Sequence, residues 1–402
     1  MGGSLFLSPM SYILKHILVV EKLIAGYKSS LPFSVYLKDY FSKNKKHGSK
    51  DRKSITHLSY TYFRLGKCIA DKDFNTRLIV AIYLSNNKMP SYAETLFENS
   101  LLNEWSEDIS NRIDKVKDIY PSFNLEQLLP FSTNELSGGI NVQSFIQQHF
   151  SQPKLFARIR PGKKEQVLNK LNAANIEFLS LEENSLSFSN ATSLEAIVTL
   201  NEEVVIQDYS SQKVATIFQY ISNKGARLKV WDCCAASGGK SILMNDCIPN
   251  LSFTVSDIRA SIIANLKERF KRAGIKDYDA FVGNISDNKT IPQNKFDIVI
   301  ADVPCTGSGT WGRTPEYLST FNINSLDEFT ERQKKIITNV ASSVNSKGYL
   351  IYITCSCLKG ENEDVITYFQ DKNSNYTLLH QTILEGYNHS ADTMFAAILQ
   401  KV

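Results

Sequence analysis

Apolar residues recur three or four positions apart over the first 130 residues, a spacing that predicts amphipathic helices. The pattern is clearest over residues 13–24 and 55–65. Pro90 and Ser91 interrupt it and predict a helix boundary. We therefore expect residues 1–135 to form a helical domain.

The pattern becomes alternating after residue 140. Residues 155–160 (LFARIR) alternate as a strand does, and residues 162–171 then predict a short helix. Two further strands are predicted at residues 176–178 and 186–189. This order predicts a small α+β module over residues 140–210, and its basic residues suggest that it faces RNA.

From residue 211 onward, strand patterns and helix patterns take turns. The candidate strands are Leu228–Asp232, Phe253–Asp257, Ala280–Val282, Phe296–Asp302, Tyr349–Thr354, Tyr376–Leu379 and Met394–Leu399. The candidate helices are Val214–Ser222, Ala260–Ala273, Leu326–Ser342 and Glu363–Phe369. Repeated βα units predict an α/β fold with a mostly parallel sheet covered on both faces. Ligands of such sheets bind beyond the carboxyl ends of the strands, so residues just after each strand deserve most scrutiny.

Composition adds mainly exclusions. The 402 residues are 43% hydrophobic and 21% charged, which excludes a largely disordered chain. A formal net charge of +4 permits a polyanionic partner without requiring one. Because no apolar run approaches the roughly 18 residues of a membrane span, we expect no membrane partner.

The cysteines suggest a reducing compartment. Six of the seven lie after residue 232, and an odd, clustered set argues against a secreted disulfide framework. A metal site that includes Cys355 and Cys357 is the alternative, but no paired CxxC motif and no nearby histidine supports it. We expect reduced thiols, no metal and a cytoplasmic location.

Basic residues gather in one short segment. Residues 43–53 contain six of them and a single acid: Lys43, Lys45, Lys46, Lys50, Arg52 and Lys53. A solvated loop is one interpretation, and a patch that contacts RNA phosphates is the other. We predict phosphate contacts for these six residues and for Arg158 and Arg160 of the small module.

Two features suggest a nucleotide-like cofactor. Gly238 and Gly239 follow the first strand and permit close approach of a ligand to the backbone, although a plain β-to-α turn has the same appearance. The second strand ends at Asp257, where doubly wound folds place an acid that binds ribose hydroxyls; a helix N-cap is the alternative. Together they favour a cofactor that contains a nucleoside.

Two cysteines follow two other strands. Cys305 lies in the turn DVPCTGSG (302–309), and Cys355 follows Thr354 at the end of the fifth strand. Either one alone is readily explained as a buried structural cysteine. Both at strand ends, one of them near Asp302, indicate thiol chemistry.

These segments resemble the Nop/Sun family of RNA (cytosine-5) methyltransferases. The resemblance rests on DCCAASGGKS (232–241), SDIRASIIANLKERFKRAGI (256–275), DVPCTGSG (302–309), YITCSCLKGENED (352–364) and DTMFAAILQK (392–401). It continues through VVIQDYSSQKVA (204–215), similar to the family's lead-in helix, and LFARIRPGKKEQV (155–167), similar to its small module. Coverage is about 140–402, while GSKDRK (48–53) among helices looks more loosely like the bacterial ribosomal-RNA (Sun/Fmu-type) members.

The resemblance implies the architecture and the cofactor. Residues 211–402 would form a Rossmann-like S-adenosylmethionine-dependent methyltransferase domain with a seven-stranded, mostly parallel sheet. It would follow the small module and the helical domain. The implied cofactor-binding residues are Cys234, Ala235, Ala236, Ser237, Gly238, Gly239, Lys240, Asp257, Asn284 and Asp302.

The resemblance also implies the catalytic roles. Cys355 would be the nucleophile that adds to cytosine C6, and Cys305 the second thiol that removes the C5 proton and releases the enzyme. Asp302 would bind the cytosine edge. Ser237 stands where the family usually has proline and Asn284 where it usually has aspartate, so we expect retuned cofactor binding.

We therefore expect a monomeric enzyme that methylates C5 of a cytosine in RNA, ribosomal RNA in the first place. A transfer-RNA methyltransferase and a non-catalytic RNA-binding ribosome assembly factor are the alternatives. A DNA cytosine methyltransferase uses the Pro-Cys thiol as its nucleophile, which would leave Thr354-Cys355 unexplained.

Overall fold

The computed structural model describes the chain except residues 1–8, 30, 87, 98–100, 102–104 and 223–224. The chain forms two compact units. The first comprises residues 1–134, 141–152 and 311–323, and the second residues 135–140, 153–310 and 324–402. Our division into segments at residues 135, 140 and 210 stays a prediction.

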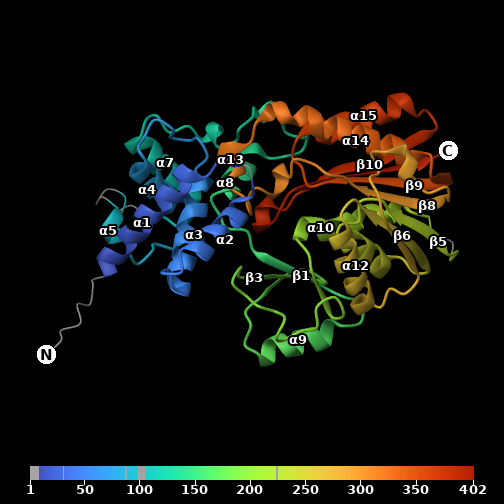
Figure 1. The fold of residues 1–402 in the computed structure, drawn as a ribbon, viewed down its shortest axis with the longest axis horizontal. Helices are drawn as coiled ribbons and strands as arrows, with labels where there is room; N and C mark the ends of the chain where they lie inside the picture. Colours follow the sequence, from blue (N-terminus) through green and yellow to red (C-terminus); the bar gives the residue numbers. More distant parts are fainter. Residues whose placement is uncertain (1–8, 30, 87, 98–100, 102–104, 223–224) are drawn as a thin grey trace. The chain divides into compact units, whose positions relative to one another are not determined.

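The first unit is helical, as predicted (Figure 1). Ile55 and Leu58 of its third helix are fully buried, and Asp73 caps the fourth by accepting hydrogen bonds from the N–H groups of Asn75 and Thr76. Its helices are α1 (Pro9–Gly26), α2 (Phe33–Lys43), α3 (Ser49–Arg64), α4 (Phe74–Ser85), α5 (Ala93–Leu96), α7 (Ile109–Ile119), η1 (Leu125–Leu128), α8 (Val142–Gln148) and α13 (Tyr317–Thr320).

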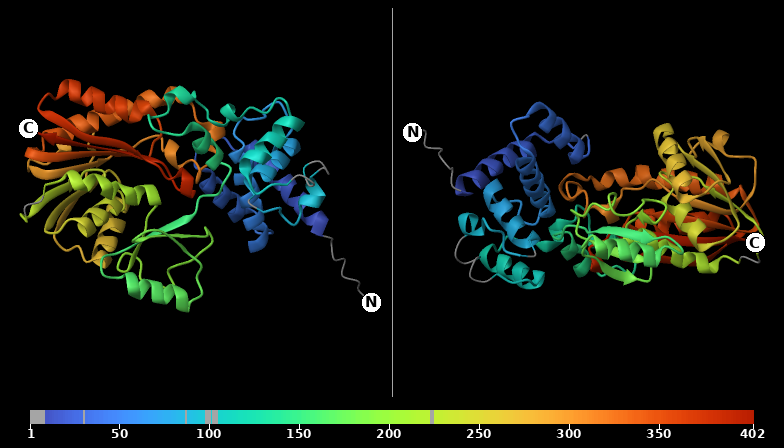
Figure 2. Two further views of the ribbon diagram at one scale, coloured as in Figure 1. Left: turned by 180° about the vertical axis from the view of Figure 1, so that it is seen from behind. Right: turned by 90° about the horizontal axis from the view of Figure 1, so that it is seen from below.

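The second unit begins with a small antiparallel sheet of order β2-β3-β1-β4. Its elements are β1 (Leu155–Ile159), α9 (Lys164–Ala173), β2 (Leu179–Glu182), β3 (Ser185–Phe188) and β4 (Val204–Ile206). Val167 and Leu171 of α9 pack on this sheet, and Figure 2 shows α9 beside it from two further directions.

Two expectations for this module were wrong. The strand predicted at 176–178 lies at Leu179–Glu182, because the chain first turns through Asn175, whose φ is +52°, and Ile176 and Phe178 pack into the core without strand pairing. Residues 204–206, which resemble part of a lead-in helix, form β4 because their backbone pairs with β1. Helix α10 (Tyr209–Lys213) begins only afterwards.

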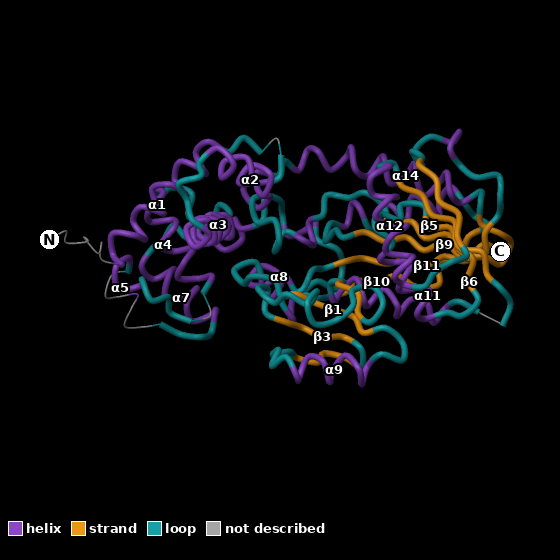
Figure 3. Tube along the Cα trace, turned by 60° about the horizontal axis from the view of Figure 1, so that its bottom comes forward, coloured by secondary structure: helices purple, strands orange, loops and turns teal. Residues whose placement is uncertain are grey.

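The larger sheet confirms the α/β prediction. It has seven strands in the order β10-β11-β9-β8-β5-β6-β7, and β11 is antiparallel to both of its neighbours while the remaining pairs are parallel. Figure 3 shows strands of this sheet in orange, with β5, β9 and β11 among those labelled. The strands are β5 (Leu228–Asp232), β6 (Leu251–Asp257), β7 (Tyr278–Val282), β8 (Phe296–Asp302), β9 (Val344–Thr354), β10 (Tyr376–Leu384) and β11 (Met394–Lys401).

Helices cover both faces of this sheet (Figure 1). One apolar core joins the strands to η3 (Val214–Tyr220), α11 (Gly239–Cys247) and α12 (Ala260–Ala273). The other joins them to α14 (Leu326–Ala341) and α15 (Glu363–Lys372). The helix predicted at Val214–Ser222 is a 3₁₀ segment that directly continues α10.

The strand order predicts where a ligand binds. Strands β6 and β7 extend the sheet on one side of β5, whereas β8 and β9 lie on the other. The order therefore reverses between β5 and β8, and a crevice opens at the carboxyl ends of strands at such a switch point. The turns after β5, β6, β8 and β9 meet at this edge.

Candidate active site

The turn between β5 and α11 has a backbone that only glycine fits at one position. Gly238 has a φ of +82°, and a Cβ there would lie 2.7 Å from the Phe270 ring. Ser237 accepts hydrogen bonds from Arg269 through its carbonyl at 2.9 Å and its hydroxyl at 2.6 Å. Arg269 of α12 therefore fixes the turn at Ser237.

Asp257, at the end of β6, is 7% exposed and accepts hydrogen bonds at both carboxylate oxygens. Its Oδ1 accepts from the Arg259 backbone N–H at 2.9 Å and Nε at 3.0 Å, and its Oδ2 accepts from the Ala236 N–H at 3.1 Å. Burial would raise the pKa of Asp257, but these hydrogen bonds hold it below its ordinary value. The N-cap of α12 is Arg259, so the capping alternative for Asp257 was wrong.

Asn284 follows β7 on the rim of the same region. Its side chain is exposed, and its Oδ1 accepts from the Ser286 N–H at 3.1 Å. The preceding Gly283 donates its N–H to the Asp257 carbonyl at 3.1 Å. The turn after β7 is thereby tied to the end of β6.

Asp302, at the end of β8, forms an ion pair with Lys240 of α11. Lys240 Nζ lies 3.2 Å from Asp302 Oδ2, and the Lys240 side chain is only 10% exposed. The same Nζ donates to the Ser211 hydroxyl at 2.8 Å. Sequence reasoning missed Ser211, because nothing local marks a serine 29 residues away as a partner of Lys240.

Cys305 and Cys355 face each other across the ends of β8 and β9. Their sulfur atoms are 3.3 Å apart. The hydrogen bond with Cys355, together with burial, raises the pKa of the Cys305 thiol well above its ordinary value. The two sulfur atoms share one hydrogen bond, in which either thiol can be the donor.

A buried carboxylate holds the Cys305 turn. Glu361 accepts from the Thr306 N–H at 2.8 Å and from Gln333 Nε2 at 2.9 Å. Gly309, at the end of the turn, donates its N–H to the Cys355 carbonyl at 3.0 Å. The two thiols are thus positioned by hydrogen bonds between their turns.

A cavity of about 1110 Å³ opens at these strand ends. The predicted residues that line it are Cys234, Ala236, Asp257, Asn284, Asp302, Cys305 and Cys355. Five other predicted residues support the turn without lining the cavity: Ala235, Ser237, Gly238, Gly239 and Lys240. The charged wall from α14 was not predicted, because only the packing of α14 shows which face looks inward: Asp327, Glu328, Glu331, Arg332 and Lys335.

Two of the residues predicted to contact RNA form a buried ion-pair cluster. Arg158 and Arg160 of β1 both pair with Asp246 of α11, each at 2.6 Å, and their side chains are only 9% and 11% exposed. The ion pairs give both guanidinium groups a structural role, and phosphate contacts by these two residues stay a prediction.

The structure leaves the lysine-rich segment 43–53 available for contact with phosphates. It spans the end of α2, the turn 44–48 and the first turn of α3, so it is a helix–turn–helix connection rather than one loop. Lys43 is exposed and pairs with Asp39 at 2.7 Å, and Arg52 lies over the Phe41 ring. Phosphate contacts by this segment stay a prediction.

The part of the chain described here has no helix apolar and long enough to cross a membrane. Within the same residues, no group of three or more histidine, cysteine, aspartate or glutamate side chains gathers as a metal site would require.

Comparison with known sequences gives a consistent set of relatives. Residues 220–399 match the family described as 16S rRNA methyltransferase RsmB/F. Ribosomal RNA small subunit methyltransferase B of Proteus mirabilis is 27% identical over 272 residues, which are 64% of this chain and 62% of that protein. A Bacillus subtilis protein described as a probable enzyme of this name is 29% identical over 57% of this chain and 52% of its own length. The matches thus span little more than half of each relative.

Solved structures show the same fold. The crystal structure of PH0851 aligns with a TM-score of 0.66 at 19% identity, over 98% of this chain and 100% of that one. NSun6 from Pyrococcus horikoshii, solved with SFG, aligns with a TM-score of 0.56 at 13% identity, over 65% of this chain and 94% of that one.

Proposed function

Residues 220–399 form a methyltransferase domain of the RsmB/F type within the Nop/Sun family, and on that premise we propose that this protein methylates C5 of a cytosine in RNA. The observation that carries the proposal is the pair of thiols 3.3 Å apart on one cavity wall, in the cavity that Asp257 also lines. Cytosine C5 becomes nucleophilic only after a nucleophile adds to C6, and this site offers two thiols.

The residues at the strand ends fit S-adenosylmethionine, which supplies a methyl group on a sulfonium. Asp257 is a buried carboxylate beside a glycine turn, the arrangement that binds ribose hydroxyls in doubly wound sheets. Gly238 allows the turn to pack against Phe270, and Ala236 of the same turn lines the cavity beside Asp257. These two features support the cofactor assignment.

The chain's residues then act in sequence. The Cys355 thiolate would add to C6, and C5 would then take the methyl group as the bond between that group and the sulfonium sulfur breaks, with its electron pair staying on the sulfur. Removal of the C5 proton next lets the bond between Cys355 and C6 break, which restores the aromatic ring and frees the thiolate. Cys305, as a thiolate at that stage, would take the C5 proton, because its sulfur lies 3.3 Å from the Cys355 sulfur that is bonded to C6. Asp302, paired with Lys240, binds the cytosine edge.

A denaturing gel separates the two thiols. With RNA and cofactor, Cys305→Ala should give a slow-migrating protein–RNA band, because addition and methyl transfer proceed but elimination stalls. Cys355→Ala and the double variant should give none, and Cys247→Ala, an exposed cysteine outside the cavity, should behave as wild type. A band from Cys355→Ala instead would reverse the roles, and no band with full turnover in both variants would rule out the covalent mechanism.

Ribosomal RNA is the proposed substrate, supported by the names of the matched relatives. Transfer of labelled methyl groups to ribosomal RNA, followed by bisulfite sequencing of the product, tests it directly. Labelling confined to transfer RNA would favour the tRNA enzyme, and RNA binding without any transfer would favour a non-catalytic assembly factor.

The proposal takes the enzyme to be a monomer in a reducing compartment such as the cytoplasm, where its thiols stay reduced. All seven cysteines are free thiols in the structure.

A further inference from the structure

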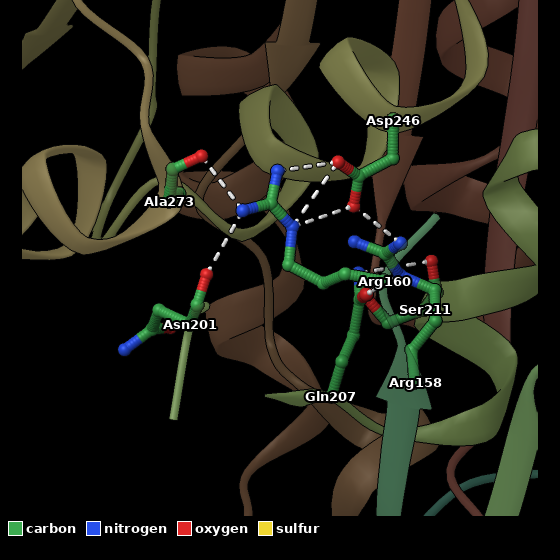
Figure 4. A network of polar contacts seen from close by, with 7 residues as sticks. All are labelled: Arg158, Arg160, Asn201, Gln207, Ser211, Asp246 and Ala273. Carbon is green, nitrogen blue, oxygen red and sulfur yellow. Dashed lines mark hydrogen bonds and ion pairs between the residues drawn. The ribbon is translucent and has the colours of Figure 1, made fainter. Parts of the chain in front are cut away.

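A chain of hydrogen bonds begins at Asp246, a buried acid on the side of α11 that contacts the small sheet. Asp246 is 4% exposed at its side chain and accepts from Arg158 Nη1 and Arg160 Nη2, each at 2.6 Å. Figure 4 shows both arginines converging on Asp246. Arg160 also donates to the carbonyls of Asn201 at 3.0 Å and Ala273 at 2.7 Å, so the clamp joins the small sheet to both α11 and α12.

The chain continues from Arg158 to Ser211. Arg158 Nε donates to Gln207 Oε1 at 3.1 Å, and Gln207 Nε2 donates to the Ser211 hydroxyl at 3.1 Å (Figure 4). Gln207 directly follows β4, is 7% exposed, and donates its backbone N–H to the Phe156 carbonyl of β1 at 3.2 Å. The placement of the Gln207 amide is therefore set by the small sheet.

The last links reach the reacting site. The Ser211 hydroxyl accepts from Lys240 Nζ at 2.8 Å, and the same Nζ pairs with Asp302 at 3.2 Å. A hydroxyl oxygen accepts two hydrogen bonds, which Gln207 and Lys240 supply together. Because the Lys240 side chain is only 10% exposed, little water is at hand to replace a lost acceptor.

We propose that Ser211 is a positioning residue for Lys240, and that Gln207 links its placement to the arginine clamp of the small sheet. The Ser211 hydroxyl and the Asp302 carboxylate both contact the Lys240 ammonium, so Ser211 fixes the direction from which Lys240 reaches Asp302. The small module thereby sets the geometry of the Lys240–Asp302 pair in addition to any contact with RNA. This inference rests on the proposed methyl transfer, in which Asp302 binds the cytosine.

Single-turnover methyl transfer to RNA tests the proposal. Ser211→Ala should lower the rate constant of transfer about tenfold, the effect of one lost hydrogen bond to a charged group, while the KM values for RNA and cofactor stay within twofold of wild type. Ser211→Thr keeps the hydroxyl and should restore most of the rate. Thr216→Ala, which removes an exposed hydroxyl bonded only to the Lys213 carbonyl, is the matched control and should equal wild type.

A double-mutant cycle distinguishes positioning from general destabilisation. If Ser211 acts through Lys240, Ser211→Ala should add no further loss to Lys240→Met, whereas additive losses would overturn the proposal. A raised KM for RNA with an unchanged rate constant would also overturn it, because that result indicates direct RNA contact. Gln207→Leu should lower the rate constant in the same direction, and a wild-type rate would refute the link to the small sheet.

Failure of the inference and failure of the proposed function look different. If wild type transfers no methyl group to any RNA, the proposed function fails. If wild type is active and Ser211→Ala matches it, only the positioning role fails.

Discussion

Two buried aspartates near the cofactor end of the site, Asp257 and Asp232, differ in the pKa of their carboxyl groups. Asp257 accepts hydrogen bonds from Arg259 and Ala236 and stays ionised. Asp232, at the end of β5, is fully buried and accepts only from the Ser241 hydroxyl at 2.7 Å, while its Oδ1 has no hydrogen-bond partner. Burial, partly offset by Ser241, raises the pKa of Asp232 to about 7.

The raised pKa of Asp232 predicts a pH-dependent effect on stability. Folded Asp232 holds its proton up to about pH 7, whereas the unfolded carboxyl loses it near its ordinary value of 3.8. Its contribution to stability is therefore present below pH 3.8 and declines as the pH rises to about 7.

Asp232→Asn removes this titration. Its free energy of unfolding relative to wild type should rise between pH 4 and pH 7 by at most about 1.4 kcal/mol per pH unit and then level off. Urea unfolding of both proteins across pH 4–8 measures it. A constant difference would show that Asp232 titrates normally in the fold, and Asp279→Asn on β7 is the control in a more exposed setting.

Among the elements, the turn after β8 is held by hydrogen bonds on two sides. Gly309 donates to the Cys355 carbonyl at 3.0 Å, and its own carbonyl accepts from the Thr393 N–H at 2.9 Å. The turn is thus bound to the end of β9 and to the start of β11. A Cβ on Gly309 would lie 1.9 Å from the Thr393 carbonyl oxygen, a backbone atom that cannot rotate away.

Gly309→Ala should therefore push the turn that carries Cys305 away from the ends of β9 and β11. We expect a loss of about 3 kcal/mol in the free energy of unfolding, in the range of severe overpacking, together with loss of methyl transfer. Denaturant unfolding and single-turnover assays measure the two effects. Gly138→Ala is the control, because a Cβ there would meet nothing closer than 3.8 Å, and it should leave the free energy of unfolding nearly unchanged. An equally small loss of stability in Gly309→Ala would show that the turn moves freely.

At the scale of the whole molecule, the distribution of charge bears on the proposed binding of RNA. The net charge of +4 is small, and the clamp on Asp246 takes up two of the arginines near the small sheet. The segment 43–53 is then the strongest local concentration of positive charge that sequence reasoning found. Its charges lie on and between two helices, where several can follow one phosphate backbone.

Neutralising Lys43, Lys45, Lys46, Lys50, Arg52 and Lys53 should flatten the salt dependence of RNA affinity. Each lost phosphate contact lowers the slope of log affinity against log salt by up to about 0.9, so the six together lower it by at most about 5. Fluorescence anisotropy between 50 and 300 mM salt, about the useful range, measures the slope. Neutralising the exposed Lys267, Lys271 and Lys276 is the control, and an equal slope in both variants would make segment 43–53 a solvated surface.

The sequence by itself determined the alternation of strands and helices after residue 211 and the positions of Asp257, Asp302, Cys305 and Cys355 at strand ends. Local patterns suffice there, because burial and turns set them, and parallel strands bring their carboxyl ends to one edge. Only the tertiary structure decided which polar groups pair over long stretches of chain. Arg158 meets Asp246 across 88 residues, and Ser211 meets Lys240 across 29. Such pairs depend on how whole elements pack against one another, and a local pattern of apolar and polar residues does not predict that packing.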